Sequence, residues 1–174
     1  ADGAHIINAV SGMIVSDGRR QTGAGLSGPE ILRHARGTST TMDALAAYPS
    51  GTVAEVLDEL AALRDRLVAA GVHAENIILD PGLGFAKGGM QDWELLAALG
   101  QLHTLGHRVL IAGSRKRFLA NALNAADAVR TKTQNPAASA NTVPDQMPPA
   151  RTPEDRDAAS AALSALVAAQ GVWG

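Results

Sequence analysis

The pattern of apolar positions is most regular between residues 52 and 70. Apolar side chains recur there every three or four residues, as on one face of a helix: Val53, Val56, Leu57, Leu60, Leu63 and Leu67. Thr52 and Glu55 have the spacing of a capping box, and Gly71 is a typical residue after a helix end. We therefore predict a helix over residues 52–70.

Three more helices are predicted by similar patterns, with expected bounds of 92–105, 115–123 and 152–170. The last begins with Thr152-Pro153, which combines a cap residue with proline at the first helical position. Glycines follow the ends of the first and the last of these helices. Their buried faces are expected to carry Trp93, Leu96, Leu99 and Leu102 in the first, and Leu163, Leu166 and Val167 in the last.

Short apolar runs without a helical period predict strands at 4–10, 30–34, 76–79 and 108–112, with a further strand beginning at Val172. Apolar strands that alternate with helices are typical of a parallel sheet. Residues 13–29 are predicted to be a loop. Residues 124–150 hold few large apolar side chains and predict a flexible insertion. The expected fold class is α/β, in a single domain over residues 1–174.

Composition narrows the range of functions. The chain has 174 residues, of which 46% are hydrophobic and only 3% aromatic, so one domain with an aliphatic core is expected. A net charge of −2 gives no electrostatic case for nucleic acid or an anionic membrane surface. The absence of cysteine excludes disulfides and thiol chemistry, and it fits the cytoplasm. The five histidines show no metal-ligand spacing, so no protein-held metal is predicted.

Neither a membrane span nor a signal peptide is expected. No apolar run is long enough to cross a bilayer, and the first residues lack a basic region followed by an apolar one. Because the chain begins without methionine at the edge of a predicted strand, we interpret its first residue as an internal start.

The segment Asn76–Lys87 gives the strongest indication of a site. A predicted buried strand ends at Asp80 and leads into a loop that contains Gly82 and Gly84. Glycines allow positive φ and a close backbone approach to a ligand. Pro81 favours an extended conformation at the preceding Asp80. We interpret Asp80 as a carboxylate presented at the end of a strand.

A second strand has the same design with the opposite charge. The predicted strand 108–112 leads into a small-residue turn that ends in cations, Gly113-Ser-Arg-Lys116. Parallel-sheet proteins bind ligands at the C-terminal ends of their strands. Asn8, Asp80 and Lys116 all lie at or near such ends, so they predict one shared polar ligand site. By contrast, Lys87 and His34 are interpreted as structural residues.

Four segments resemble motifs of the dihydropteroate synthase family and occur in the family's order: Ile6–Gly12, His34–Met42, Asp80–Lys87 and Gly113–Leu119. The resemblance implies a (β/α)8 TIM barrel of the pterin-binding type. A whole barrel takes roughly 250 residues, so the chain would supply about the middle and C-terminal two-thirds. The first strands and the last strand, with its Arg-x-His anion site, would be missing.

The activity implied by the resemblance is a transferase reaction of folate biosynthesis. It condenses 6-hydroxymethyl-7,8-dihydropterin pyrophosphate with 4-aminobenzoate and releases pyrophosphate. The family likeness further implies Mg²⁺ bound with the pyrophosphate through ligands outside this chain, a homodimer, cytoplasmic location and a sulfonamide target.

The same resemblance assigns roles to particular residues. Asn8, Asp80 and Lys116 would bind the pterin, and Asp80 and Lys116 would carry the catalysis. The 4-aminobenzoate would lie against Phe85, Lys116 and Arg117. The two residues before Lys116, Ser114 and Arg115, would support the turn and help to neutralise anionic groups.

Departures from the family leave two alternatives open. Ala9 stands where the family has a polar residue, and Arg33 and Ala35 stand where it has methionine. The first alternative is a non-catalytic pterin-binding remnant, which the missing Arg-x-His strand favours. The second is a methyltetrahydrofolate-binding barrel, against which the turn at residues 114–116 argues.

Overall fold

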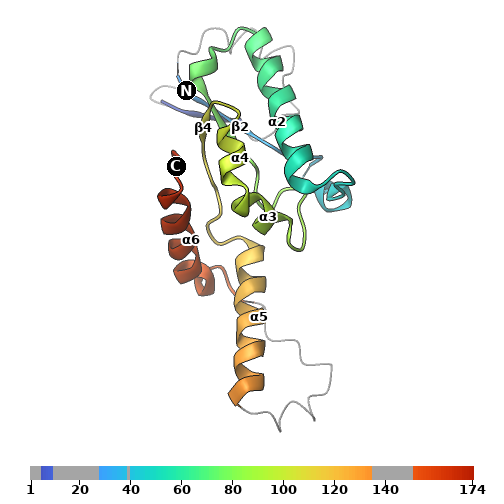
Figure 1. Cartoon of the computed structure of the whole chain (residues 1–174), viewed down its shortest axis with the longest axis vertical. Helices are drawn as coiled ribbons and strands as arrows, with labels where there is room; N and C mark the ends of the chain where they lie inside the picture. The colour runs from blue at the N-terminus through green and yellow to red at the C-terminus, as the bar shows by residue number, and fades with distance from the viewer. Residues whose placement is uncertain (1–4, 10–27, 39, 135–150) are drawn as a thin grey trace. The chain divides into compact units, whose positions relative to one another are not determined.

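The computed structural model describes residues 5–9, 28–38, 40–134 and 151–174 (Figure 1). By contacts the chain divides into two compact units. The first comprises the chain up to Ala112 together with Leu166–Gly174, and the second comprises Gly113–Ala165. The single-domain expectation stays a prediction. Residues 13–27, which make up most of the loop predicted at 13–29, lie outside the described residues.

A parallel sheet of four strands forms the centre of the first unit, in the order β1-β2-β3-β4. The strands are β1 (Ile7–Ala9), β2 (Glu30–Arg33), β3 (Ile77–Asp80) and β4 (Arg108–Val109). All residues of β3 are buried, as expected for a strand covered on both faces. The predicted α/β class and its parallel sheet are confirmed.

Backbone pairing continues beyond β4 along the C-terminal segment. The Leu110 N–H donates to the Leu79 carbonyl at 2.8 Å, so the β3–β4 pairing continues. The Trp173 N–H donates to the Val109 carbonyl, and the Ile111 N–H donates to the Gly174 carbonyl, both at 2.8 Å. These bonds extend the sheet past β4, which is consistent with the strand predicted to begin at Val172.

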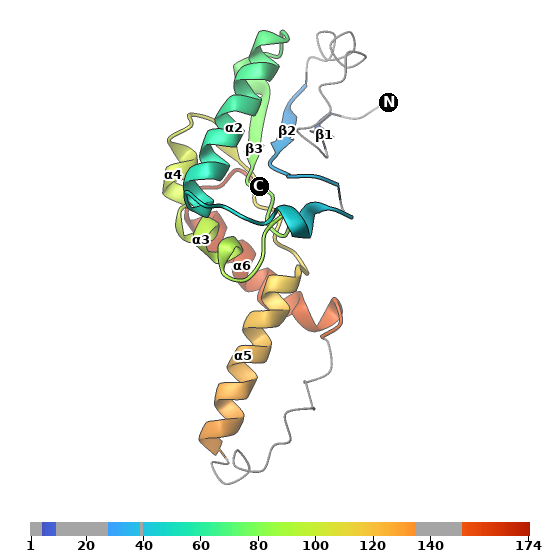
Figure 2. The same ribbon diagram turned by 90° about the vertical axis from the view of Figure 1, so that its right-hand side faces the viewer.

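Helix α2 (Thr52–Ala69) packs against β2 and α3, and its buried residues are Thr52, Val56, Leu60, Leu63 and Leu67. Figure 2 shows α2 on the same side of the sheet as α3 and α4. The predicted capping box is wrong, because Gly51 is the N-cap and Thr52 is already helical. Glu55 instead accepts the Ser50 N–H at 2.6 Å, two residues further back than the Thr52 N–H of the predicted capping box.

The predicted helix at 92–105 is two helices, α3 (Gln91–Ala97) and α4 (Leu99–His103), which are separated at Ala98. The apolar spacing continues across Ala98, with Leu95, Leu96, Leu99 and Leu102 all buried. Periodicity alone therefore could not reveal the break. Helix α4 packs against β4.

The second unit contains α5 (Arg117–Gln134), the short helix η4 (Glu154–Arg156) and the start of α6 (Asp157–Ala169). The helix predicted to end at residue 123 continues to Gln134, so the part of the expected insertion from 124 to 134 is helical, and residues 135–150 lie outside the described residues. Alanine favours a helix even where few side chains are buried.

The buried face of α6 differs from the prediction at one residue. Leu163 and Val167 are buried as expected, and Ser160 joins them, whereas Leu166 is 65% exposed. Residues 160, 163 and 167 lie on one helical face at three- and four-residue spacing, and Leu166 lies beside it. The predicted cap Thr152 is wrong, because Pro153 is the N-cap of η4, although the Thr152 hydroxyl accepts the Asp155 N–H at 3.4 Å. The α-helix itself begins only at Asp157.

Candidate active site

Asp80 is the last residue of β3 and is only 1% exposed. Its carboxylate Oδ1 accepts the Gly82 N–H at 2.8 Å, and its carbonyl accepts the His34 N–H at 2.8 Å. The first bond closes a short turn that fixes the direction of the side chain. The strand and the loop together therefore hold a carboxylate in a defined position at the C-terminal end of the sheet.

Asn8 and Asp80 lie on the same face of the sheet. Asn8 is in register with Ile31 of β2, and Ile31 is in register with Ile78 of β3. Residues in register point to the same side of a parallel sheet, and so do alternate residues of a strand. Asp80 follows Ile78 by two positions, so it shares this face with Asn8, which is exposed. The two strands are roughly 10 Å apart across β2.

The loop after β3 depends on Gly82. Its φ is +70°, and a Cβ atom there would lie 1.9 Å from the carbonyl oxygen of His34. Further along the loop, the Gly84 N–H donates to Asp92 Oδ1 at 2.7 Å, and the Tyr48 hydroxyl donates to the Ala86 carbonyl at 2.9 Å. The loop that follows Asp80 is thus held from several sides.

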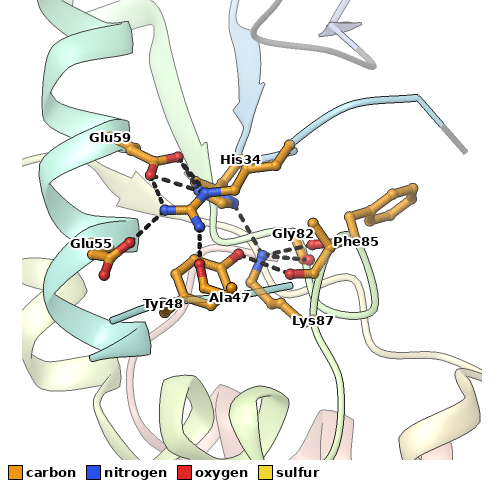
Figure 3. Close-up of polar contacts among 10 residues, drawn as sticks. His34, Ala47, Tyr48, Glu55, Glu59, Gly82, Phe85 and Lys87 are labelled. Carbon is orange, nitrogen blue, oxygen red and sulfur yellow. Dashed lines mark hydrogen bonds and ion pairs between the residues drawn. The ribbon is translucent and has the colours of Figure 1, made fainter. Parts of the chain in front are cut away.

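Lys87 belongs to the same loop, and its side chain is buried (Figure 3). Its Nζ donates to the carbonyls of Gly82 at 3.1 Å and Phe85 at 3.0 Å, and to His34 Nδ1 at 3.0 Å. An ammonium group has three protons, and each of them has an acceptor here. The expected structural role of Lys87 is confirmed, because its charge fastens the loop between Gly82 and Phe85.

His34 connects the loop to α2. Because Nδ1 accepts a hydrogen bond from Lys87, the neutral ring carries its proton on Nε2, which donates to Glu59 Oε2 at 2.9 Å. Burial and the charge of Lys87 lower the pKa of His34 from 6.5 to about 4. Burial raises the pKa of Glu59, but hydrogen bonds from Arg36 and His34 outweigh burial and hold that pKa below its ordinary value.

Arg36 completes this network, which we call the loop anchor and define as Lys87, His34, Glu59 and Arg36. Its Nε donates to Glu59 at 3.0 Å, and an Nη donates to the Ala47 carbonyl at 2.6 Å. Its guanidinium lies 4.0 Å from the centre of the Tyr48 ring. Sequence reasoning missed Arg36, Glu59 and Tyr48. The motif around His34 was the available signal, but it did not indicate which residue of α2 would meet it.

Phe85, predicted to form a wall of the aminobenzoate pocket, is half-buried in the middle of the loop between β3 and α3. The Arg33 guanidinium lies 4.0 Å from the centre of its ring. Arg33 is in register with Asp80, so it lies on the same face of the sheet. The structure therefore places Asn8, Asp80 and Phe85 in the first unit, with Asn8 and Asp80 on one face of its sheet.

The other predicted site residues belong to the second unit. Lys116 is half-exposed, while Ser114, Arg115 and Arg117 are exposed. Arg115 has a positive φ of 57° and donates two hydrogen bonds to Asp157, at 2.6 and 2.9 Å. Hydrogen bonding to Asp157 raises the pKa of Arg115, and the same bonds lower the pKa of Asp157. This geometry favours the turn-supporting part of the role expected for Arg115.

Among the described residues, no group of three or more His, Asp or Glu side chains could hold a metal ion. No described helix is long and apolar enough to cross a membrane.

A buried, fixed carboxylate at the C-terminal edge of a parallel sheet, with an amide on the same face, defines an α/β protein with a candidate polar ligand site at its strand ends. A sequence model described as "pterin binding enzyme" matches residues 1–174. The chain therefore belongs to the pterin-binding enzyme family.

Individual relatives agree with the family. The chain is 37% identical to dihydropteroate synthase of Mycobacterium leprae over 172 residues, which are 99% of this chain and 54% of that protein. Dihydropteroate synthase of Yersinia pestis, solved as a sulfonamide drug complex, superposes with a TM-score of 0.76 at 27% identity, covering 98% of this chain and 52% of that one. The Xanthomonas albilineans enzyme in complex with 7,8-dihydropteroate gives 0.70 at 28% identity, covering 98% and 52%.

The chain spans about half the length of these relatives, with 54% of one and 52% of another covered. The covered part of these relatives is therefore smaller than the two-thirds of a whole barrel that was expected from the length of the chain.

Proposed function

We propose that this chain carries the pterin-recognition part of a dihydropteroate synthase. The observation that supports this most strongly is Asp80, a buried carboxylate fixed by the Gly82 N–H on the sheet face that also carries Asn8. Membership of the pterin-binding enzyme family and the likeness to a synthase in complex with 7,8-dihydropteroate agree with it.

The chemistry of a pterin suits these two residues. One edge of the ring presents an N–H beside an exocyclic NH2, and a carboxylate accepts both protons in a bidentate pair. Burial strengthens such a pair and prevents water from competing for it. The amide of Asn8 both donates and accepts, so it can pair with the remaining ring heteroatoms.

In the proposed reaction, the C–O bond between the pterin methylene and the pyrophosphate breaks, and pyrophosphate leaves with the electron pair. The electron-rich pterin ring stabilises the carbocation, and the neutral amine of 4-aminobenzoate attacks it and then loses a proton to water. Positioning and charge stabilisation would supply most of the rate. Asp80 and Lys116 would hold the pterin, and Phe85, Lys116 and Arg117 the aminobenzoate. Ser114 and Arg115 would support the turn before Lys116.

The same proposal extends to the complete fold, the metal ion, the oligomeric state, the location and the inhibitors. The four parallel strands would form part of a (β/α)8 barrel, completed by strands outside this chain. Mg²⁺ would bind with the pyrophosphate, through ligands outside this chain, as the resemblance to the synthase family implies. Homodimerisation, cytoplasmic location and inhibition by sulfonamides belong to the proposal as well.

A calorimetric titration with 6-hydroxymethyl-7,8-dihydropterin pyrophosphate and Mg²⁺, followed by 4-aminobenzoate, tests the proposal. We expect saturable pterin binding and then the appearance of 7,8-dihydropteroate. Binding without product would favour the non-catalytic remnant. Binding of methyltetrahydrofolate in place of the pterin pyrophosphate would favour the methyltetrahydrofolate-binding barrel. A chain that binds neither ligand would contradict the proposal.

A further inference from the structure

The turn before Lys116 has an unusual backbone. The Lys116 N–H donates to the Gly113 carbonyl at 3.4 Å, and the third residue of this turn, Arg115, has a φ of +57°. Glycine or asparagine normally occupies a turn position with positive φ, because a larger side chain is strained there. Strain of this kind persists only where the surroundings hold it, and it is concentrated at functional sites.

Three residues hold Arg115 in this conformation, and we call them the turn clamp: Arg156, Asp157 and Ser160. The Arg115 N–H donates to Ser160 Oγ at 2.9 Å, and the Arg115 carbonyl accepts from Arg156 Nη1 at 2.7 Å. The side chain of Arg115 forms a bidentate pair with Asp157. The backbone N–H, the backbone carbonyl and the guanidinium of the strained residue therefore all have partners in one short segment.

The turn clamp is itself fixed. Ser160 is buried, and its hydroxyl donates to the Arg156 carbonyl at 2.8 Å. Arg156 also donates to the Arg151 carbonyl at 2.6 Å. Arg151 in turn pairs with Asn124 and Asp127 of α5.

Lys116 lies between the clamped residue and the start of α5 at Arg117. Its carbonyl accepts the Leu119 N–H at 3.2 Å, so the backbone is held on the helix side of Lys116 as well. A lysine side chain is long and flexible, and its direction depends first on where its own backbone is fixed. The turn clamp thus holds the backbone next to the residue from which the Lys116 side chain extends.

We propose that Arg156, Asp157 and Ser160 are positioning residues for Lys116, which hold the strained turn from which its side chain reaches the substrate. This inference rests on the proposed function, in which Lys116 contacts the pterin. None of the three residues was a candidate site residue from the sequence, because they lie about forty positions from the turn that they hold.

Amide hydrogen exchange gives the first test. In Ser160→Ala, the Arg115 amide loses its acceptor, so we expect its exchange to accelerate about tenfold. Ser164→Ala is the matched control, because Ser164 is exposed on the same helix. Equal exchange at Arg115 in wild type, Ser160→Ala and Ser164→Ala would overturn the inference.

Coupling to Lys116 gives the second test. We expect Ser160→Ala to weaken binding of the dihydropterin pyrophosphate about tenfold in the wild-type chain and to have no further effect in Lys116→Ala. The loss should also shrink in an Arg115→Gly background, since glycine adopts a positive φ without support. A residue with a merely structural role would lower the unfolding midpoint but would show the same loss with and without Lys116.

The outcomes separate the two hypotheses. Equal pterin affinity in the wild-type chain and in Ser160→Ala overturns the inference and leaves the proposed function standing. A wild-type chain that binds no pterin refutes the proposed function and the substrate-directed part of the inference. In that case hydrogen exchange at Arg115 still decides whether the clamp holds the turn.

Discussion

At Gly82 the backbone passes so close to His34 that a side chain has no room. A Cβ atom would lie 1.9 Å from the His34 carbonyl oxygen, and the φ of +70° is already unfavourable for other residues. We expect Gly82→Ala to lower the free energy of unfolding by about 3 kcal/mol. Gly88→Ala is the matched control in the same loop, because nothing lies within 4 Å of its Cβ position and its φ is not positive. Equal denaturation midpoints for the two variants would contradict this reading.

The turn that contains Gly82 could be predicted from the sequence, because it is formed by residues next to one another in the chain. Asp80-Pro-Gly predicts a turn after a strand, and the turn is present. Leu166, by contrast, was assigned to the buried face of α6 and is 65% exposed. Its apolar character is no guide to its orientation, because the packing of the helix decides which face is covered.

At the scale of elements, the loop anchor connects β2, α2 and the loop after β3 through a neutral histidine. The unfolded chain binds a proton at His34 below about pH 6.5, whereas the folded chain does so only below about pH 4, because burial and Lys87 lower the pKa. The associated stability is fully present above pH 6.5 and is lost as the pH falls toward 4. Burial raises the pKa of Glu59, which accepts from His34, but hydrogen bonds from Arg36 and His34 outweigh burial and hold that pKa below its ordinary value.

We therefore expect the free energy of unfolding to fall by about 2 kcal/mol between pH 7.5 and pH 5. In His34→Gln most of this fall should disappear, since glutamine can accept from Lys87 and donate to Glu59 without titrating. Urea denaturation at the two pH values measures it. His73→Gln changes an exposed histidine and is expected to keep the wild-type response. If the free energy of unfolding of His34→Gln fell by the same amount between the two pH values, the role given to His34 in the loop anchor would be contradicted.

The elements differ in how far they could be predicted. Helix 52–70 followed from its periodicity, because a buried helical face imposes its spacing on the sequence, and the strands followed from short apolar runs without a helical period. The break at Ala98 did not, since the apolar spacing continues through it. The helical extension to Gln134 was missed for the opposite reason, because an exposed helix has no apolar face to reveal it.

At the scale of the whole molecule, the sheet of the first unit includes the last residues of the chain. The N–H groups of Trp173 and Ile111 each donate across this junction at 2.8 Å. We expect both amides to exchange with solvent at least about tenfold more slowly than the amide of Ser114 in the exposed turn. Hydrogen exchange followed by NMR measures this difference. Equal rates would show that the segment does not pair with β4.

The α/β fold class and the candidate ligand-binding residues could be predicted from the sequence, because proteins with parallel sheets bind ligands at the C-terminal ends of the strands. The partners of those residues could not. Glu59 meets His34 across 25 positions, and Ser160 meets Arg115 across 45. Such pairings depend on how helices dock, which local sequence does not encode.

Calorimetric titration of wild type and Asp80→Asn with 6-hydroxymethyl-7,8-dihydropterin pyrophosphate shows whether Asp80 binds the pterin. Asparagine keeps the size of the side chain but replaces one acceptor with a donor and removes the charge. We predict a loss of affinity of roughly 30- to 100-fold, as expected for charge-assisted hydrogen bonds. Asp58→Asn, at an exposed site on α2, should bind as the wild type does. Unchanged pterin affinity in a folded Asp80→Asn chain would contradict the account.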